Sequence, residues 1–280
     1  MVKRYTNETT LFPSAGAFMS ESFPFWPVAF VTGSSRGIGR GIALALAAKG
    51  FDVAVHGRSN AVEAQRTADE IVALGRRATV VLGEIGDLAR HEAMIEEAEA
   101  ALGPLTTFVN NAGVGALKRG DVLEASVESY DHCMLYNAKA AFFLTQAVAR
   151  RMVTRPRDPA GYYSILLVSS VSATAASINR GEYCVSKAAT AMIAQVFAAR
   201  LAREGVYVFD IQPGVIETDM SRPALADYQR RIDEEGLTLI PRLGQPQDVG
   251  TVAASIAAGG LPYVSGQVIR VDGAMLLPRL

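Results

Sequence analysis

The stretch TGSSRGIG, residues Thr32–Gly39, follows the apolar run VAFV and leads into an alanine-rich segment. Its glycines, Gly33, Gly37 and Gly39, permit a tight turn and let the backbone approach a pyrophosphate at a helix N-terminus. By itself such a turn is weak evidence, because a turn can need glycine only for its backbone angles. The position of this one between a predicted strand and a predicted helix favours a dinucleotide-binding loop.

Short apolar runs recur after this loop and alternate with longer segments of helical period. The predicted strands are Val28–Thr32, Asp52–Gly57, Ala78–Gly83, Thr106–Asn111, Ser164–Ser170, Val206–Gln212 and Gln267–Asp272. The clearest helical segments are Gly41–Gly50, His91–Gly103 and Lys187–Gly205. Strands that are apolar almost throughout are typical of a parallel sheet covered on both faces. The sequence therefore predicts an α/β fold, a doubly wound parallel sheet of Rossmann type in one domain.

Composition excludes several classes of protein. The chain has 280 residues and a formal net charge of −1, which argues against a nucleic-acid or membrane-surface partner. Its two cysteines and three histidines are scattered and give neither a disulfide framework nor a metal-ligand spacing. No apolar run is long enough to span a bilayer. We therefore expect a cytoplasmic protein that binds no metal, no nucleic acid and no membrane.

The first residues differ in composition from the remainder. Residues 1–27 have a basic start, but proline, serine and asparagine interrupt them and no signal-peptide core is present. They are predicted to be a flexible N-terminal extension ahead of a single domain at residues 28–280. Met19 is an alternative translational start, since the segment that follows it leads directly into the first strand.

Further motifs follow the glycine loop in a characteristic order. They are NNAG at Asn110–Gly113, YNAK with Asn137, LLVSS with Ser170, YCVSK at Tyr183–Lys187 and PGVIETDM at Pro213–Met220. With the T-G-x-x-x-G-x-G loop, they resemble the short-chain dehydrogenase/reductase family over about residues 28–275. The likeness is greatest to its 3-oxoacyl-acyl-carrier-protein reductase-like members.

Tyr183 and Lys187 lie four residues apart, on one face of a predicted helix. A free phenol ionises near pH 10 and is a poor acid–base catalyst at neutral pH, with ~4 kcal/mol needed to change that. A cation roughly 4 Å away in a partly shielded site supplies energy on that order. A solvated helix face would carry the same pair. The resemblance implies the functional reading, with Tyr183 as the acid and Lys187 as the cation that also binds the nicotinamide ribose.

The resemblance assigns two further catalytic residues. Ser170, thirteen residues before Tyr183, would hold the substrate carbonyl oxygen through its hydroxyl, and Asn137 would help to keep a water-mediated proton path beside Lys187. Without the resemblance, Ser170 reads as a strand-end cap and Asn137 as a buried amide that satisfies backbone groups.

The resemblance also implies a nicotinamide cofactor. The residues expected to contact it are Gly33, Ser35, Arg36, Gly37, Ile38, Gly39, Arg58, Glu84, Ile85, Asn111, Ala112, Gly113, Tyr183, Lys187, Pro213, Gly214, Ile216 and Thr218. Gly57 stands where an acidic residue would select NAD, and Arg36 and Arg58 suit a 2′-phosphate. NADP(H) is therefore predicted to be preferred, with NAD(H) left open. Glu84 replaces the usual aspartate at the adenine, and Asp87 is the alternative in another strand register.

The substrate is less well defined. The resemblance favours a carrier-bound 3-oxoacyl thioester, and the basic segment Ala149–Arg157 is a candidate dock for an acidic carrier protein. Asn179, Arg180 and Glu182, between Ser170 and Tyr183, could instead bind a small polar substrate, which favours a sugar or polyol dehydrogenase, or could be solvated loop residues. A non-catalytic nucleotide-binding or structural member is a third alternative, against which the complete tetrad argues.

Two expectations concern larger features. Residues 217–240 are predicted to form a mobile helical flap over the substrate. The resemblance implies a homotetramer, and KAATAMIAQVFAARLA, from Lys187 to Ala202, carries apolar positions on more than one face, as a helix with a partner helix would.

Overall fold

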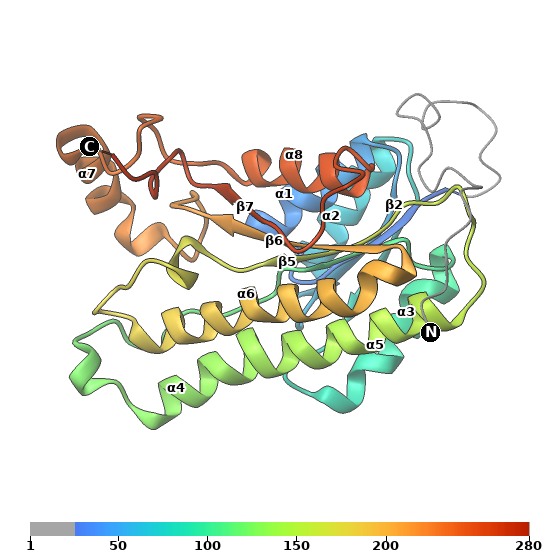
Figure 1. Cartoon of the computed structure of the whole chain (residues 1–280), viewed down its shortest axis with the longest axis horizontal. Coiled ribbons are helices and arrows are strands. Elements are labelled where there is room, and N and C mark those ends of the chain that lie inside the picture. Colours follow the sequence, from blue (N-terminus) through green and yellow to red (C-terminus); the bar gives the residue numbers. More distant parts are fainter. Residues whose placement is uncertain (1–25, 280) are drawn as a thin grey trace, which may run out of the picture.

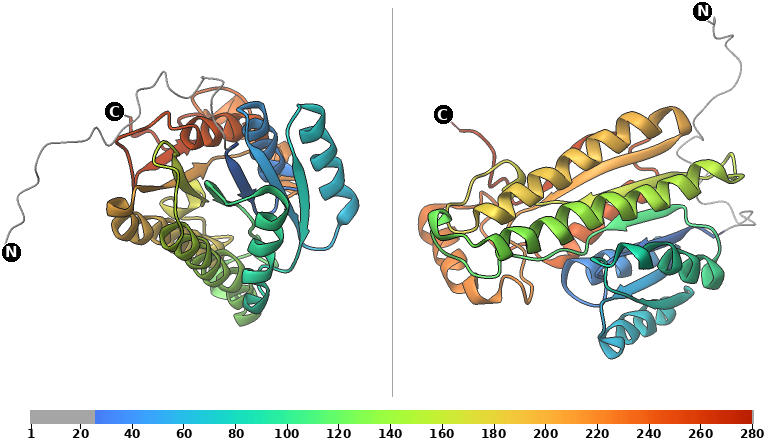
Figure 2. Two further views of the ribbon diagram at one scale, coloured as in Figure 1. Left: turned by 90° about the vertical axis from the view of Figure 1, so that its right-hand side faces the viewer. Right: turned by 90° about the horizontal axis from the view of Figure 1, so that it is seen from below.

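The computed structural model describes residues 26–279. A parallel sheet forms the middle layer, and helices cover both of its faces (Figures 1 and 2). The predicted α/β fold with a single doubly wound sheet is confirmed. Most of the predicted N-terminal extension lies outside the described residues. Within them, Pro27 accepts a backbone hydrogen bond from Asp52, and the Trp26 ring lies 4.0 Å from the guanidinium carbon of Arg76.

All seven predicted strands are present in one sheet. They are β1 (Val28–Val31), β2 (Asp52–Gly57), β3 (Ala78–Leu82), β4 (Thr107–Asn110), β5 (Tyr163–Val168), β6 (Val206–Pro213) and β7 (Val268–Val271). The order is β3-β2-β1-β4-β5-β6-β7, and every neighbouring pair is parallel. The strand order reverses between β1 and β4. In such sheets ligands bind at this switch point, beyond the carboxyl ends of the strands.

The helices divide between the two faces. They are α1 (Gly37–Ala48), α2 (Ala61–Ala73), α3 (His91–Leu102), α4 (Val127–Cys133), α5 (Ala141–Thr154), α6 (Gly181–Leu201), α7 (Leu225–Glu235) and α8 (Pro246–Ala257). A π-helical turn, Met134–Ala140, joins α4 to α5. Figures 1 and 2 show α5 and α6 running side by side along one face of the sheet. Compared with prediction, α1 begins at Gly37 instead of Gly41, and α6 begins at Gly181, so that Tyr183 and Lys187 lie on one helix as predicted.

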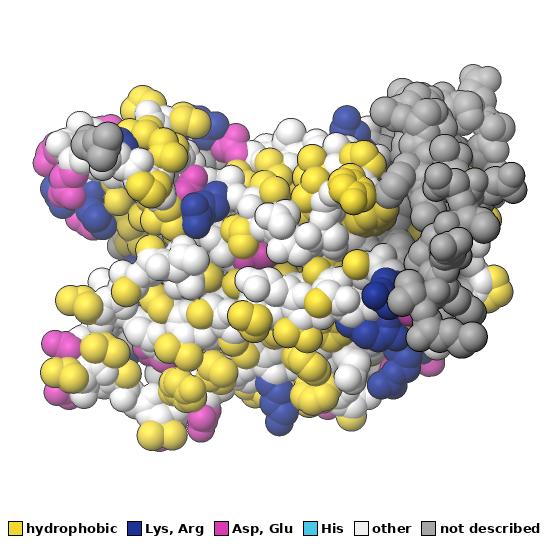
Figure 3. Space-filling model, in the orientation of Figure 1, with side chains coloured by type: hydrophobic (Ala, Val, Ile, Leu, Met, Phe, Trp, Pro, Cys, Tyr) yellow, Lys and Arg dark blue, Asp and Glu magenta, His cyan; other side chains and the backbone are white. Residues whose placement is uncertain are grey.

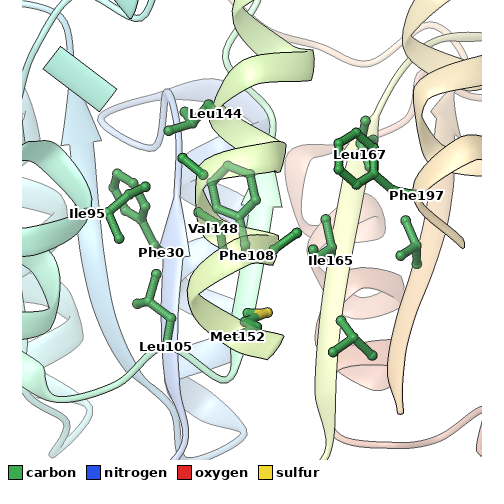
Figure 4. Close-up of a cluster of buried hydrophobic side chains, with 14 of the residues drawn as sticks. Phe30, Ile95, Leu105, Phe108, Leu144, Val148, Met152, Ile165, Leu167 and Phe197 are labelled. Carbon is green, nitrogen blue, oxygen red and sulfur yellow. The ribbon is translucent and has the colours of Figure 1, made fainter. Parts of the chain in front are cut away.

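Two apolar cores hold the layers together. One lies between the sheet and α3, α5 and α6, where Phe30 and Phe108 pack with their ring centroids 5.9 Å apart (Figure 4). The other lies between the opposite sheet face and α1, α2 and α8. Successive side chains of a strand point to opposite faces, so Ala29 and Val31 join the second core while Val28 and Phe30 join the first. The strands are buried on both faces for this reason.

Helices α1 and α8 pack unusually closely. A Cβ atom on Gly250 would lie 2.3 Å from the carbonyl oxygen of Gly41, and one on Gly41 would lie 2.5 Å from that of Pro246. Both glycines are needed because side chains there would push the helices apart. This contact fixes the position of α1, and with it the end of the glycine loop.

Candidate active site

The glycine loop lies between β1 and α1, at the switch point of the sheet. Gly33 and Gly37 have φ angles of 63° and 56°, in the left-handed region that favours glycine. A Cβ atom on Gly39 would lie 2.3 Å from the carbonyl oxygen of Gly33, so the loop folds tightly onto the first turn of α1. That turn has no acidic residue and no side-chain cap at Arg36. Its N–H groups are therefore suited to an anionic group such as a pyrophosphate.

The NNAG motif supports this loop from β4. The Thr32 hydroxyl accepts hydrogen bonds from the backbone N–H groups of Asn111 and Ala112, at 2.9 and 3.0 Å. The Asn111 side-chain amide donates to the carbonyl oxygens of Thr32, at 2.9 Å, and Gly33, at 3.3 Å. Asn110 turns the other way and donates to the carbonyl of Ala141 in α5, at 3.0 Å. The motif therefore ties the glycine loop to the sheet and the sheet to α5.

His56, a residue that sequence reasoning did not select, holds the same loop from β2. It is buried, and its Nδ1 accepts a hydrogen bond from the backbone N–H of Gly33 at 3.1 Å. Its Nε2 lies 3.1 Å from the carbonyl oxygen of Gly83, an arrangement that requires a neutral ring with the proton on Nε2. Burial lowers the pKa of His56 from 6.5 to about 4, which keeps the imidazole neutral. One ring thus links the ends of three structural elements.

The two arginines expected at the adenosine end are exposed. Arg36 lies 3.5 Å from Asp219, and Arg58 lies 3.9 Å from Glu84. The side chains of both arginines are more than 70% exposed, so these ion pairs are weak and can rearrange. No carboxylate is expected beside Arg58 from the sequence, but the structure brings Glu84 there.

The other expected cofactor residues surround the same edge of the sheet. Ser35 and Ile38 belong to the glycine loop and the first turn of α1, Ile85 is buried after β3, and Ala112 and Gly113 follow β4. Pro213 ends β6, and a Cβ atom on Gly214 would lie 2.7 Å from the Cα of Asp272. Thr218 reaches back to the glycine loop, where its methyl carbon would lie 3.5 Å from a Cβ on Gly37. The chain after β6 thus folds over the start of α1.

Tyr183 and Lys187 lie in the first turns of α6. The Lys187 ammonium is buried, lies 5.8 Å from the centre of the Tyr183 ring and donates to the carbonyl oxygen of Val168 at 3.0 Å. Among the described residues, the Tyr183 hydroxyl has no hydrogen-bond partner. A half-buried phenol beside a buried cation, with a free hydroxyl, can deliver a proton to a substrate oxygen.

Asn137 lies in the π-helical turn between α4 and α5. Its side chain both accepts from the backbone N–H of Val114, at 2.8 Å, and donates to its carbonyl, at 2.9 Å. It also donates to the Ser186 hydroxyl at 2.9 Å. A Cβ atom on Gly113 would lie 2.8 Å from Asn137 Oδ1 and 3.4 Å from Lys187 Nζ, so the two side chains converge there. Single π turns of this kind are frequent at functional sites.

Ser170 follows β5 at the same edge. It is 8% exposed, and its hydroxyl oxygen accepts from the backbone N–H of Ser172 at 3.1 Å. That bond leaves the hydroxyl proton available for a further acceptor. The structure thus places Asn137, Ser170 and the Tyr183–Lys187 pair at the same edge of the sheet, from three separate segments.

The three residues expected at the mouth of the site, Asn179, Arg180 and Glu182, differ in burial and in hydrogen-bond partners. Glu182 is buried, and its carboxylate accepts from the Ser129 hydroxyl at 2.5 Å, so neither a substrate-binding nor a solvated role fits it. The Asn179 side chain accepts from the Ser177 hydroxyl. The Arg180 guanidinium lies 5.3 Å from the centre of the Tyr183 ring.

The basic segment Ala149–Arg157 lies elsewhere. It ends α5 and leads to the amino end of β5, whereas the site lies beyond the carboxyl ends of the strands. Arg151 is paired with Glu92, Glu96 and Glu99. Arg155 is also paired with Glu99. Two of the four arginines of the segment are therefore paired, and the segment lies at the opposite edge of the sheet from Tyr183.

The predicted flap contains a short 3₁₀ turn, Arg222–Ala224, followed by α7. Its helical character agrees with the prediction. Among residues 26–279, no group of three or more His, Cys, Asp or Glu side chains could hold a metal ion, and no helix is long and apolar enough to cross a membrane.

Residues 27–229 match the family described as short chain dehydrogenase. The chain belongs to this family. It is 33% identical over 251 residues to 2-dehydro-3-deoxy-D-gluconate 5-dehydrogenase from Dickeya dadantii, which covers 89% of this chain and 95% of that relative. This short-chain dehydrogenase is therefore an oxidoreductase.

Solved structures agree with this assignment. A crystal structure of 3-oxoacyl-[acyl-carrier protein] reductase from Brucella melitensis in complex with NAD has a TM-score of 0.87 and 38% identity, covering 91% of this chain and 99% of that one. A gluconate 5-dehydrogenase from Burkholderia cenocepacia in complex with NADP and tartrate has a TM-score of 0.82 and 28% identity, covering 90% and 96%. The relatives bind either nicotinamide nucleotide, so a nicotinamide cofactor fits the glycine loop described above.

Proposed function

We propose that this short-chain dehydrogenase uses NADP(H) to interconvert an alcohol and a carbonyl on a small, polar, hydroxylated substrate of the sugar or sugar-acid type. The observation that carries this choice over a carrier-bound substrate is the state of the segment Ala149–Arg157. Two of its four arginines, Arg151 and Arg155, are paired with glutamates of α3, and the segment lies toward the amino ends of the strands, at the opposite edge of the sheet from Tyr183. A carrier protein docked there would face the amino ends of the strands, whereas Tyr183 lies beyond their carboxyl ends.

The reaction follows from the positions of the side chains. In the reductive direction, the Tyr183 hydroxyl donates its proton to the substrate carbonyl oxygen, and in the oxidative direction its phenolate takes the proton of the substrate alcohol. The Ser170 hydroxyl donates a hydrogen bond to the same oxygen and keeps it in reach of Tyr183. The bound nicotinamide supplies the hydride-transfer chemistry.

Lys187 and Asn137 act behind Tyr183. The Lys187 ammonium uses one donor on the carbonyl of Val168. The remaining donors are available to a ribose. Asn137 ties Val114 to Ser186 and so keeps the chain after β4 next to Lys187.

Reduction of a 3-oxoacyl thioester is the second candidate function. It is favoured by the 38% identity to the 3-oxoacyl-[acyl-carrier protein] reductase from Brucella melitensis. The two candidates differ in direction and in substrate, so they are separated by one set of assays. NADPH oxidation is followed with an acetoacetyl thioester, and NADP⁺ reduction with D-gluconate and D-glucitol. Turnover of the thioester alone would replace the proposed function by the second candidate.

The preference for NADP(H) rests on Arg36 and Arg58. Exposed ion pairs such as those with Asp219 and Glu84 are worth about 0–1 kcal/mol, so both guanidiniums can turn to a 2′-phosphate. A charge-assisted hydrogen bond to phosphate is worth about 1.5–3 kcal/mol.

The cofactor preference is tested by nucleotide dissociation constants. Arg58→Ala and Arg36→Ala are expected to weaken NADPH binding about tenfold or more each and to leave NADH binding unchanged. Arg66→Ala, an exposed arginine paired with Glu63 in α2, serves as the matched control. Equal losses for both nucleotides would contradict the preference.

We also propose a homotetramer in the cytoplasm. Exposed apolar side chains gather over α4, α5 and α6 (Figure 3), and include Phe143, Met192 and Val196. An apolar hollow of about 500 Å³ between these helices is lined by residues such as Met134, Phe142 and Ile193. Both cysteines are free, which suits a reducing compartment.

A further inference from the structure

We propose that the substrate carries a carboxylate close to its reacting carbon and that Arg180 binds this carboxylate. The inference rests on the proposed function, because it concerns the same site and takes Tyr183 as the residue that meets the reacting oxygen. It narrows the substrate from hydroxylated molecules in general to hydroxylated acids.

Arg180 is placed at the reacting end of the site. It immediately precedes α6, and its guanidinium carbon lies 5.3 Å from the centre of the Tyr183 ring. The residue is half-buried, and its Nε atom is buried without a hydrogen-bond partner. A group bound by this guanidinium would therefore lie beside the oxygen that meets Tyr183.

No anion of the described chain neutralises Arg180. Its side chain forms no ion pair and no hydrogen bond within residues 26–279. Glu182, the nearest acid in sequence, is turned inward to the Ser129 hydroxyl. Asp121, on the facing loop, accepts from the backbone N–H of Leu123. Both of these carboxylates thus have partners other than Arg180.

The facing loop is joined to the segment that carries Arg180. The backbone N–H of Gly120 donates to the carbonyl of Asn179 at 3.1 Å, which joins this loop to the residue before Arg180. Lys118 and Arg119 precede Gly120, are exposed, and form no ion pair within the described part of the chain. Asp121 and Glu124 follow these two cations on the same exposed loop, so the selection of an anion rests on Arg180 itself.

The chemistry of the guanidinium selects the ligand. A partly desolvated arginine without a partner is costly, and a carboxylate satisfies it with two parallel hydrogen bonds. A phosphate would be recognised in the same way and is an outcome of the test. An uncharged sugar or a thioester offers only single neutral acceptors.

Arg180 has one other conceivable role. Its charge lies near Tyr183 and would stabilise negative charge on the reacting oxygen whatever the substrate is. This role predicts a change in kcat and in its pH profile for all substrates alike. Binding of a carboxylate predicts a change in KM for charged substrates alone.

The kinetic test uses a matched pair of probes. D-Gluconate carries a carboxylate on a hydroxylated chain, and D-glucitol is its uncharged counterpart. We expect kcat/KM to favour gluconate, and Arg180→Gln to lower kcat/KM for gluconate by about 10- to 100-fold through KM while changing glucitol little. Arg180→Lys should restore part of the loss. Arg203→Gln, an exposed arginine at the far end of α6, is the control and should match the parent.

A binding test does not depend on turnover. The complex of the full chain with NADP⁺ is titrated calorimetrically with tartrate, with inorganic phosphate and with erythritol. We expect tartrate to bind the parent and to lose at least about tenfold in affinity with Arg180→Gln, while NADP⁺ binds both proteins equally. Tighter binding of phosphate than of tartrate, or equal binding of tartrate by parent and Arg180→Gln, would overturn the inference. Tartrate binding through Arg180 without turnover of any alcohol would keep the inference and contradict the proposed function.

Discussion

His56 connects the glycine loop to two neighbouring strands through a single neutral ring. A protonated ring could not accept the hydrogen bond from Gly33, since both nitrogens would then be donors. Burial is the main cause of its low pKa, the charge of His91 lowers it further, and the carbonyl of Gly83 and the charge of Glu84 oppose this. The loop geometry at Gly33 therefore requires that His56 Nδ1 carries no proton, as is the case at neutral pH.

This dependence predicts how stability changes with pH. The folded pKa of His56, about 4, lies below the ordinary value of 6.5, so the unfolded chain binds a proton that the folded chain does not. Above about pH 6.5 the ring is neutral in both states and does not change the free energy of unfolding. As the pH falls from there to about 4, the unfolded chain takes up the proton first, and the free energy of unfolding decreases by about 3 kcal/mol in full. His56→Asn removes the titrating ring. The free energy of unfolding, measured with urea at several pH values in this range, should therefore decrease less steeply with falling pH than in the parent. An identical slope in both proteins would contradict the assignment.

The residues at the site differ in how well the sequence predicts them. Motif spacing predicts the four candidate catalytic residues, Asn137, Ser170, Tyr183 and Lys187. The fold places them at one edge of the sheet. His56 was missed because its hydrogen bonds reach Gly33 and Gly83, which are distant in sequence, and nothing local marks it. The inward turn of Glu182 was missed for the same reason, as its partner Ser129 lies on another helix.

At the scale of elements, α1 and the loop before it decide nucleotide binding. Gly39 packs against the Gly33 carbonyl and the Asn111 side-chain amide. A Cβ atom on Gly39 would lie 2.3 Å from the Gly33 carbonyl oxygen and 2.5 Å from Asn111 Nδ2. A side chain there must displace the loop from the Asn111 support. The strands were predicted within one or two residues because each is an apolar run bounded by turn residues. The first turn of α1 lies outside the predicted helical segment, which begins at Gly41, because Gly37 is a poor helix former whose place is set by tertiary contacts. The start of α6 at Gly181 agrees with the helix predicted for Tyr183 and Lys187.

Gly39→Ala is expected to weaken NADPH binding by at least about tenfold and to destabilise the fold by about 1–3 kcal/mol. Fluorescence titration and thermal unfolding measure the two effects. Gly50→Ala is the control, since Gly50 has a φ of 94° but nothing within 4 Å of an added Cβ. It should cost only the backbone strain, about 1–2 kcal/mol, and leave NADPH binding intact. Unchanged NADPH affinity in Gly39→Ala would refute the role given to this contact.

At the scale of the whole molecule, one helical face is apolar and the site opens at one edge of the sheet. The exposed apolar residues of α5 and α6 lie away from the glycine loop, so an assembly through them would leave the nucleotide site open (Figures 1 and 3). The sequence predicted apolar positions on more than one face of α6, but not which of them are exposed. That depends on which face the sheet covers, which only the packing decides.

Charged substitutions on this face test the assembly. Phe143 and Met192 are 40% and 54% exposed, so Phe143→Glu with Met192→Glu should leave each folded subunit intact and dissociate the tetramer. Light scattering should fall from about 119 kDa, four times 29.8 kDa, to a smaller mass. Val62→Glu, at a side chain 70% exposed on α2, is the control and should keep the parent mass. A parent that is already monomeric would show the tetramer proposal to be wrong.

The most direct test of the central claim is the initial rate of NADP(H)-linked turnover in the parent and in Tyr183→Phe. The substrates are gluconate, glucitol and an acetoacetyl thioester, with the dissociation constant of NADPH measured in parallel. We predict turnover of at least one substrate by the parent and a loss of about 10²- to 10⁴-fold in kcat for Tyr183→Phe, with NADPH binding unchanged. A Tyr183→Phe variant as active as the parent would contradict the account.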